Sequence, residues 1–327
     1  MQTGVLFASG GALGSYDIGV LKGLYEIEPD FTPNIVTGIS MGAIHAAIMA
    51  STRGNPTKIL EALWERFVRI SLPFIFEPAE SFLALLLNPH FYQLRQDYWF
   101  FPFWTSFYNP LPLRKIIEDF IDFDVLNTGP TRIIISATNI ETAEIEYFDN
   151  QGPNKTIITA DHILASCSLP LSFPMVELNQ SHYWDGGLFD SDPLTPLLER
   201  LDSKMDGVRR LVVISLYPSQ DGIPNSLFDG YIRMIGLILA NKLKAMIETL
   251  YKANSQTEQI KAFCEALPKN SRLRRHPQFS KLQKSLYIEE IIHICNTDPK
   301  LTQGNLSRES LHSRIEAGYR DVYHKFF

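Results

Sequence analysis

The stretch Gly38-Ile39-Ser40-Met41-Gly42 is the most informative part of this chain. A β-branched run from Asn34 to Thr37 precedes it, and helix-forming residues from Ala43 to Met49 follow it. This context predicts a strand, a tight turn and a helix, with Ser40 at the apex of the turn. The glycines remove side chains where the strand and helix backbones nearly touch, so the hydroxyl stands clear. Ser40 is therefore a candidate nucleophile at a helix N-terminus, where negative charge is favoured. The plainer alternative is a helix N-cap in a glycine-rich turn.

The first fifty residues contain this arrangement twice. Val5 to Ala8 predicts a short buried strand, and the glycine-rich loop Ser9 to Gly14 follows it. Apolar residues at helical spacing then predict a helix over Ser15 to Ile27. A strand–helix–strand–helix unit is typical of a parallel sheet covered by helices. We therefore predict a three-layer α/β/α fold with a mostly parallel central sheet.

The glycine-rich loop has two candidate chemistries. Dinucleotide binding is disfavoured because the spacing is G-G-x-x-G, and because Gly38-Ile39-Ser40 stands where a ribose-binding acid would be needed. An oxyanion hole is the other, since glycines let backbone N–H groups converge on one point without obstruction. Turns after neighbouring parallel strands lie at the same sheet edge, so such donors could face Ser40. The candidate oxyanion residues are Gly10, Gly11, Ala12 and Gly14.

Composition excludes several classes of protein. The 327-residue chain is 45% hydrophobic and 20% charged, which is typical of a globular protein with a substantial core. Its formal net charge of −6 gives no reason to expect a nucleic-acid partner. Three widely spaced cysteines, Cys167, Cys264 and Cys295, predict a reducing compartment without a disulfide framework or a zinc site. The N-terminus lacks a signal-peptide pattern, and no apolar run approaches the roughly 18 residues of a membrane span. We expect a cytoplasmic protein, with peripheral membrane contact left open.

Two parts of the chain depart from the repeating pattern. Residues 72–112 form an aromatic-rich insertion that includes Tyr98-Trp99-Phe100-Phe101-Pro102-Phe103-Trp104. It is interpreted either as a segment buried over the core or as a lid, a channel rim or a membrane-interface patch. Beyond residue 219 we predict an amphipathic helix over 231–251, a basic stretch over 269–284, a strand over 286–295 and a helix over 308–325.

An activated serine needs a base, and the residues alone do not name one. His45 lies five residues into the helix after Ser40, which points it away from the apex, and no other histidine has a favourable context. Asp185 stands between a strand-like segment and Gly186-Gly187. Taken alone, Asp-Gly-Gly is typical of a plain turn.

Three stretches taken together resemble the patatin-like phospholipase family: Gly10-Gly11-Ala12-Leu13-Gly14, Gly38-Ile39-Ser40-Met41-Gly42 and Asp185-Gly186-Gly187. They stand in the family's order and at the expected strand ends. Residues 165–170 also resemble the family's segment before its Asp-Gly-Gly. The resemblance covers residues 3–217, and the tail is similar to the C-terminal extension of a bacterial subgroup. It implies a patatin-like catalytic domain over 1–220, with the insertion at 72–112, and a mostly helical extension over 221–327 packed on it.

The resemblance implies a Ser-Asp dyad and no catalytic histidine. Ser40 is then the nucleophile, Asp185 the general base, and backbone N–H groups of the glycine-rich loop form the oxyanion hole. The implied reaction is hydrolysis of fatty-acyl esters of phospholipids or lysophospholipids through an acyl-enzyme, without a cofactor or a metal. Leu13 departs from the family, because many members carry Arg or Lys there. This departure puts rate or substrate preference in question more than activity.

Two other functions compete with hydrolysis. A catalytically silent lipid- or membrane-binding module of the same fold is disfavoured by the intact Ser40 and Asp185. Acyl transfer between thioester carriers on a related fold would need a base histidine in a family-like context, and the sequence offers none.

Overall fold

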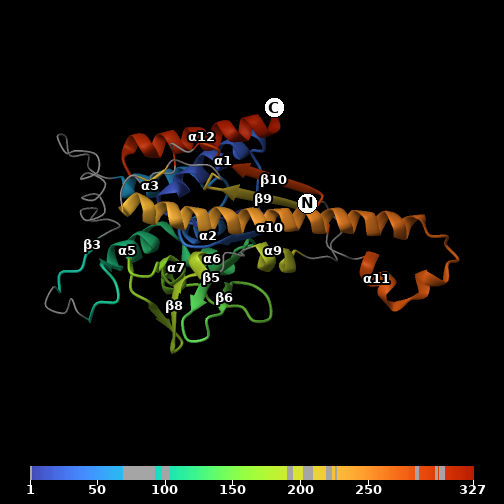
Figure 1. Cartoon of the computed structure of the whole chain (residues 1–327), viewed down its shortest axis with the longest axis horizontal. Helices are drawn as coiled ribbons and strands as arrows, with labels where there is room; N and C mark the ends of the chain where they lie inside the picture. The colour runs from blue at the N-terminus through green and yellow to red at the C-terminus, as the bar shows by residue number, and fades with distance from the viewer. Residues whose placement is uncertain are drawn as a thin grey trace.

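The central sheet organises the molecule (Figure 1). The computed structural model describes residues 2–68, 93–97, 103–189, 194–201, 209–218, 223–224, 227–283, 287–298, 301 and 306–327. Within these residues, one sheet has the order β10-β9-β1-β2-β5-β8-β7, and β6 pairs with β5. Its strands are β1 (Gln2–Phe7), β2 (Ile35–Gly38), β5 (Arg132–Asn139), β6 (Ile145–Asp149), β7 (Val176–Leu178), β8 (Ser181–Asp185), β9 (Arg209–Ser215) and β10 (Glu290–Cys295).

Strand direction follows the predicted pattern. β10, β9, β1, β2 and β5 are mutually parallel, whereas β6 and β8 run antiparallel to β5, and β7 runs antiparallel to β8. Strands β1, β2, β5 and β9 are buried on both faces, as expected when helices cover a sheet on both sides. The prediction of a three-layer fold with a mostly parallel sheet is confirmed.

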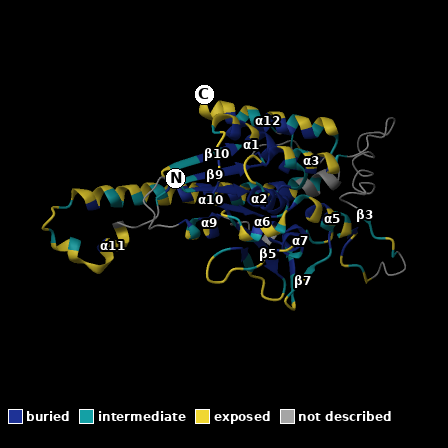
Figure 2. Ribbon diagram, turned by 180° about the vertical axis from the view of Figure 1, so that it is seen from behind, coloured by how far each residue is buried: buried dark blue, intermediate teal, exposed yellow. Residues whose placement is uncertain are grey.

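Alternate residues of the strands feed two separate cores. In β1, Val5 and Phe7 belong to one hydrophobic cluster and Leu6 to the other. The larger cluster packs under helices α1 (Ser15–Ile27), α2 (Met41–Ser51), α3 (Thr57–Phe67), α5 (Leu111–Phe120), α6 (Phe123–Thr128), α7 (Ala160–Cys167) and α12 (Arg308–Phe326). The smaller one packs under α9 (Leu194–Arg200) and α10 (Leu227–Ala266). Figure 2 shows the resulting buried centre and exposed helix faces.

The C-terminal part of the chain is built into the body. Strand β10 adds the parallel edge strand beside β9, so the sheet continues across the expected division near residue 220. Helix α12 lies directly on α1, because two glycines allow the backbones to touch. A Cβ at Gly19 would lie 1.9 Å from the carbonyl oxygen of Ile315, and one at Gly318 would lie 2.3 Å from that of Tyr16.

Helix α10 is longer than the predicted helix over 231–251. Its N-terminal half lies over the sheet, and the rest continues past the body as an arm that carries the short helices η3 (Arg272–Arg275) and α11 (Pro277–Gln283) (Figures 1 and 2). Leu250 is the last residue of α10 in the smaller hydrophobic cluster, close to the end of the predicted helix, and the residues beyond it still favour a helix. None of the helices in the described ranges combines the length and apolar composition needed to span a bilayer.

Most of the aromatic-rich insertion over 72–112 lies outside the described residues. Its described parts include the short antiparallel pair β3 (Gln93–Leu94) and β4 (Tyr108–Asn109). The Arg95 guanidinium stacks over the Trp104 ring, 5.1 Å from its centroid. Main-chain bonds from Phe107 and Tyr108 to the carbonyls of Leu171 and Ser172 join this part to the segment that leads toward Asp185.

Candidate active site

The turn between β2 and α2, called the elbow below, has the predicted order of strand, tight turn and helix, with Ser40 directly before the helix. Ser40 has φ 58° and ψ −128°, a region that non-glycine residues rarely adopt. Both flanking glycines are sterically required, because a Cβ at Gly38 would lie 2.1 Å from the carbonyl oxygen of Gly42, and one at Gly42 would lie 2.4 Å from that of Phe7. The strained turn therefore presents Ser40 at the N-terminus of α2.

Two side chains of helix α7 form hydrogen bonds with the main chain of Ser40. The Ser166 hydroxyl accepts a hydrogen bond from the Ser40 N–H over 3.0 Å, and the Cys167 thiol donates to the Ser40 carbonyl over 3.2 Å. Burial, with a further contribution from the Asp185 carboxylate, raises the pKa of Cys167 well above its ordinary value, so this thiol stays protonated. Sequence reasoning assigned neither side chain a role, although both lie in the segment over 165–170 that resembles the family.

Asp185 ends β8, opposite Ala137 of β5. Its N–H donates to the Ser168 carbonyl over 2.9 Å, which fixes its backbone. Its carboxylate accepts a hydrogen bond from the Gly187 N–H over 2.8 Å, and the nearby Ser40 side chain lowers its pKa. Residues 166–168 bond to the main chains of both Ser40 and Asp185, and so place these two residues side by side across 145 positions of sequence.

The environment of Asp185 suits a base. The carboxyl is buried, and this burial raises its pKa from 3.8 to about 6, against the opposing effects of the nearby Ser40 side chain and the Gly187 N–H. A carboxylate with a pKa near 6 is ionised at neutral pH and binds a proton more readily than an exposed aspartate. Asp185 can therefore accept the Ser40 proton when that hydroxyl attacks.

The glycine-rich loop lies beside the elbow as a short helix, η1 (Gly11–Gly14). It packs on α2, since a Cβ at Gly14 would lie 2.9 Å from the Met41 Cγ. Gly11 has φ +49°, a conformation that glycine adopts without strain. In the described part of the chain, no group accepts a hydrogen bond from the N–H of Gly11 or Ala12. Two main-chain donors of this loop, which packs on α2, are thus available to a negatively charged oxygen.

A buried arginine from α12 supports this loop. Arg314 is only 2% exposed, and its Nη1 donates to the Ala12 carbonyl over 3.2 Å while its Nε donates to the Leu301 carbonyl over 3.1 Å. Burial lowers its pKa to about 10, which still leaves it cationic at neutral pH. Sequence reasoning missed Arg314. The sequence does contain a sign that Arg314 is buried, because it lies with Leu311, Ile315 and Gly318 on the apolar stripe of the last helix.

Three histidines of the described residues, His45, His162 and His182, have structural partners. His45 is buried between Asp17, 2.8 Å from its Nδ1, and Trp64, whose Nε1 donates to its Nε2 over 2.9 Å. His162 belongs to the N-terminal cap of α7, and His182 pairs with Glu141. The described residues hold no cluster of three or more His, Cys, Asp or Glu side chains able to bind a metal ion.

Comparison with solved structures gives distant matches. VipD from Legionella pneumophila is 15% identical with a TM-score of 0.43, over 99% of this chain and 66% of VipD. A second match is to a chain in the structure of SpcU in complex with ExoU, from the type III secretion system of Pseudomonas aeruginosa. It has 13% identity and a TM-score of 0.34, and it covers 86% of this chain and 67% of the matched chain. This chain thus spans about two thirds of the length of each. No curated protein matches it.

Comparison with protein families is more informative. The family model described as patatin-like phospholipase matches residues 5–198, which is more than half of the chain. That range holds the glycine-rich loop, the elbow and the Asp185-Gly186-Gly187 turn. The resemblance predicted from those three motifs is confirmed, and the chain belongs to the patatin-like phospholipase family.

Proposed function

We propose that this protein is a serine acyl hydrolase that cleaves fatty-acyl esters of phospholipids or lysophospholipids with Ser40 and Asp185 as a catalytic dyad. The observation that carries the proposal is the position of Ser40, on a strained elbow, beside the buried Asp185 carboxylate, with residues 166–168 bonded to the main chains of both. Membership of the family supports the choice of lipid esters as substrates.

The reaction follows from the positions of these groups. The Ser40 hydroxyl oxygen attacks the ester carbonyl carbon while its proton passes to Asp185. The carbonyl oxygen becomes an oxyanion, which accepts hydrogen bonds from the N–H groups of Gly11 and Ala12. As the C–O bond to the alcohol breaks, Asp185 returns the proton to the leaving oxygen and the acyl group remains on Ser40. Water, deprotonated by Asp185, then attacks the acyl-enzyme, and the fatty acid leaves as Ser40 regains a proton.

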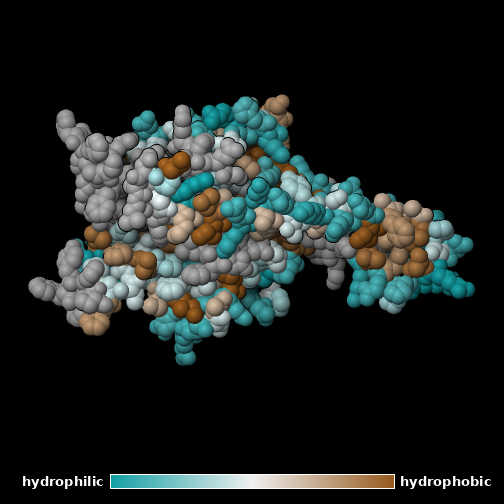
Figure 3. All heavy atoms as spheres, viewed as in Figure 1, coloured by the Kyte–Doolittle hydropathy of each residue, from teal (hydrophilic) through white to brown (hydrophobic). Residues whose placement is uncertain are grey.

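The protein would meet its substrate at a lipid surface. Four large apolar side chains near the described end of the insertion are well exposed: Phe103 by 83%, Phe107 by 47%, Leu111 by 62% and Leu171 by 64%. Hydrophobic residues lie over this region, around β3 and α5, in Figure 3. Exposed apolar side chains that adjoin a site for lipids favour contact with a membrane interface.

Hydrolysis assays test the dyad. Wild type, Ser40→Ala and Asp185→Asn are compared on a short-chain nitrophenyl ester and on a defined phospholipid and its lysophospholipid. We expect both variants to lose at least about a thousandfold in kcat, because each removes a group that takes part in every chemical step. Variants that keep the wild-type rate would disprove the dyad. A wild type that binds liposomes but hydrolyses no ester would instead indicate a lipid-binding module.

A further inference from the structure

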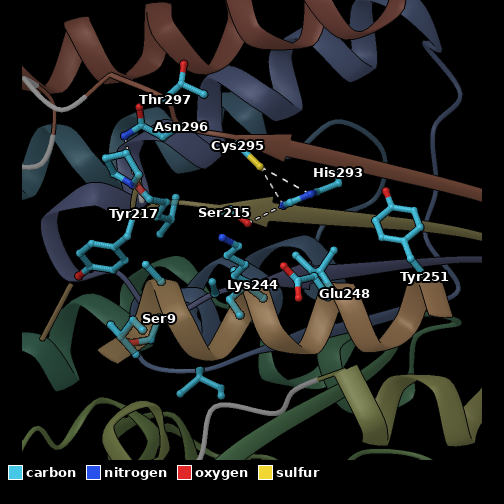
Figure 4. Close-up of a pocket in the computed structure, with 18 residues that line it drawn as sticks. Ser9, Ser215, Tyr217, Lys244, Glu248, Tyr251, His293, Cys295, Asn296 and Thr297 are labelled. Carbon is cyan, nitrogen blue, oxygen red and sulfur yellow. Dashed lines mark hydrogen bonds between the residues drawn. The ribbon is translucent and has the colours of Figure 1, made fainter. Parts of the chain in front are cut away.

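A cavity of about 550 Å³ lies between helix α10 and the sheet (Figure 4). Leu239, Leu243 and Ile247 of α10 line one side of it. The ends of β9 and β10 line the other, through Ser215, His293 and Cys295. Its size is within the roughly 300–1,000 Å³ of small-molecule sites. Helix α10 and β10 both lie beyond the residues that the family model matches, so this cavity is built largely by the C-terminal part of the chain.

One end of the cavity is lined by residues that adjoin the proposed catalytic pair. Its lining includes Ile39, which precedes Ser40, and Ser9, whose hydroxyl would lie 2.8 Å from a Cβ placed on Gly187. Tyr217 lines the same end, and its ring packs against α10 at Gly236. Burial, and after it the Asp185 carboxylate, raise the pKa of Tyr217, as expected for a phenol close to that aspartate. Figure 4 places Ser9 and Tyr217 at one end and Tyr251 at the other.

The polar groups on the floor of the cavity satisfy one another. His293 Nε2 lies 2.7 Å from Ser215 Oγ and 2.9 Å from Cys295 Sγ. Burial lowers the pKa of His293 and raises that of Cys295, so both are uncharged at neutral pH. Asn296 donates to the Leu216 carbonyl and accepts a bond from the Asp298 N–H. Because these polar side chains on β9 and β10 already have hydrogen-bond partners within the protein, an apolar ligand can cover them without leaving them unpaired.

We infer that this cavity holds one long fatty-acyl chain of the substrate, with the ester at Ser40 and the chain under α10. The inference rests on the proposed function and adds a preference for long-chain over short-chain esters. The lining runs along α10 from Leu239 to Tyr251, about 18 Å of helix, which is the scale of an extended long-chain acyl group. The occupant is apolar because Leu239, Leu243 and Ile247 of α10 face uncharged side chains on β9 and β10. The charged Lys244 and Glu248 also line the cavity, and both are exposed on α10.

A matched pair of substitutions on α10 tests the site. Ala240 lines the cavity, whereas Ala245 is exposed on the same helix. We expect Ala240→Phe to lower kcat/KM for a hexadecanoyl nitrophenyl ester by about tenfold or more, because a filled pocket excludes the chain. Hydrolysis of the acetyl ester should stay unchanged, and Ala245→Phe should change neither activity. An unchanged ratio of long-chain to short-chain activity in Ala240→Phe would overturn the inference.

Protection of Cys295 gives an independent readout that needs no turnover. Cys295 is half-buried in the cavity, whereas Cys167 and Cys264 are buried elsewhere. In the full-length Ser40→Ala variant, hexadecanoyl lysophosphatidylcholine below its micellar concentration should slow alkylation of Cys295 by iodoacetamide, and glycerophosphocholine should not. Equal alkylation rates with and without the lysolipid would overturn the site. Failure of the proposed dyad can be told apart from failure of the acyl-chain site, because only in the former would Ser40→Ala retain hydrolysis of the acetyl ester.

Discussion

Arg314 Nη1 donates a hydrogen bond to the carbonyl oxygen of Ala12, 3.2 Å away, and so joins the last helix of the chain to the first loop. The contact depends on close packing of α12 on α1 at Gly19 and Gly318. Leu13, where many family members carry a cation, is buried in the core. In this chain a positive charge therefore reaches the loop from a residue 302 positions away.

The first prediction concerns Arg314. Arg314→Met removes the donors to the Ala12 and Leu301 carbonyls, and charged hydrogen bonds of this kind contribute about 1.5–3 kcal/mol each. We expect kcat to fall by about tenfold or more while KM changes little, because the loop donors would act in the transition state. Arg314→Lys, which keeps the charge, should recover part of kcat. The thermal midpoint of each variant, measured beside its kinetics, separates misplacement of the loop from unfolding. Equal kcat in Arg314→Met and Arg314→Lys at equal stability would refute the positioning role.

The second prediction is a pH profile. Asp185 acts as a base only when ionised, and burial raises its pKa to about 6. We expect kcat/KM for a neutral nitrophenyl ester to rise with pH through about 6 and to level off above about 7. A profile that is already flat between pH 4.5 and 7 would mean that another group removes the proton.

The third prediction links the same carboxyl to stability. Because its pKa is raised from 3.8 to about 6, the folded chain binds this proton more tightly than the unfolded chain. The wild type therefore loses stability as pH rises through this window, by roughly 3 kcal/mol in total. Asp185→Asn has no such carboxyl, so it should be more stable than wild type at pH 8, and the advantage should shrink toward pH 4. Denaturant unfolding at the two pH values measures the difference. An advantage of the same size at both pH values would show that ionisation of Asp185 is not its cause.

The fourth prediction concerns strain in the elbow. Ser40 has φ 58°, where a side chain costs about 1–3 kcal/mol. Ser40→Gly relieves this cost and Ser40→Ala does not, so the glycine variant should exceed the alanine variant by about 1 kcal/mol in the free energy of unfolding. Both variants should be inactive. Equal stability of the two variants would show that the elbow stores no strain.

The sequence predicted the parts of this structure that local patterns encode. Val5 to Ala8 and Asn34 to Thr37 are β-branched or apolar runs beside glycine-rich turns, and they form adjacent parallel strands. Asp185 was different, because Asp-Gly-Gly alone is typical of a turn, and only the family resemblance linked it to Ser40. The placement of Asp185 beside Ser40 depends on pairing of β8 with β5, which no local pattern specifies.

Arg314 and the cavity under α10 depend on tertiary contacts alone. Arg314 lies on an apolar helix stripe, but its acceptor Ala12 could not be known before α12 was placed on α1. The cavity joins Ile39, Ser215, Leu243 and His293 from four segments, and it forms only when β10 pairs with β9 and α10 crosses them. Periodicity predicted that part of α10 is amphipathic, and it carried no information on what the apolar face covers.

Covalent labelling is the sharpest test of Ser40 as the nucleophile, because the cavity under α10 contains another serine with a histidine partner, Ser215, whose Oγ lies 2.7 Å from His293 Nε2. An alkyl fluorophosphonate, which phosphonylates activated serines, is incubated with wild type, Asp185→Asn and Ser215→Ala, and the modified peptide is identified by mass spectrometry. We expect one adduct, on Ser40, which persists in Ser215→Ala and is lost or strongly slowed in Asp185→Asn. An adduct on Ser215, or labelling of Ser40 at the wild-type rate in Asp185→Asn, would contradict the proposed dyad.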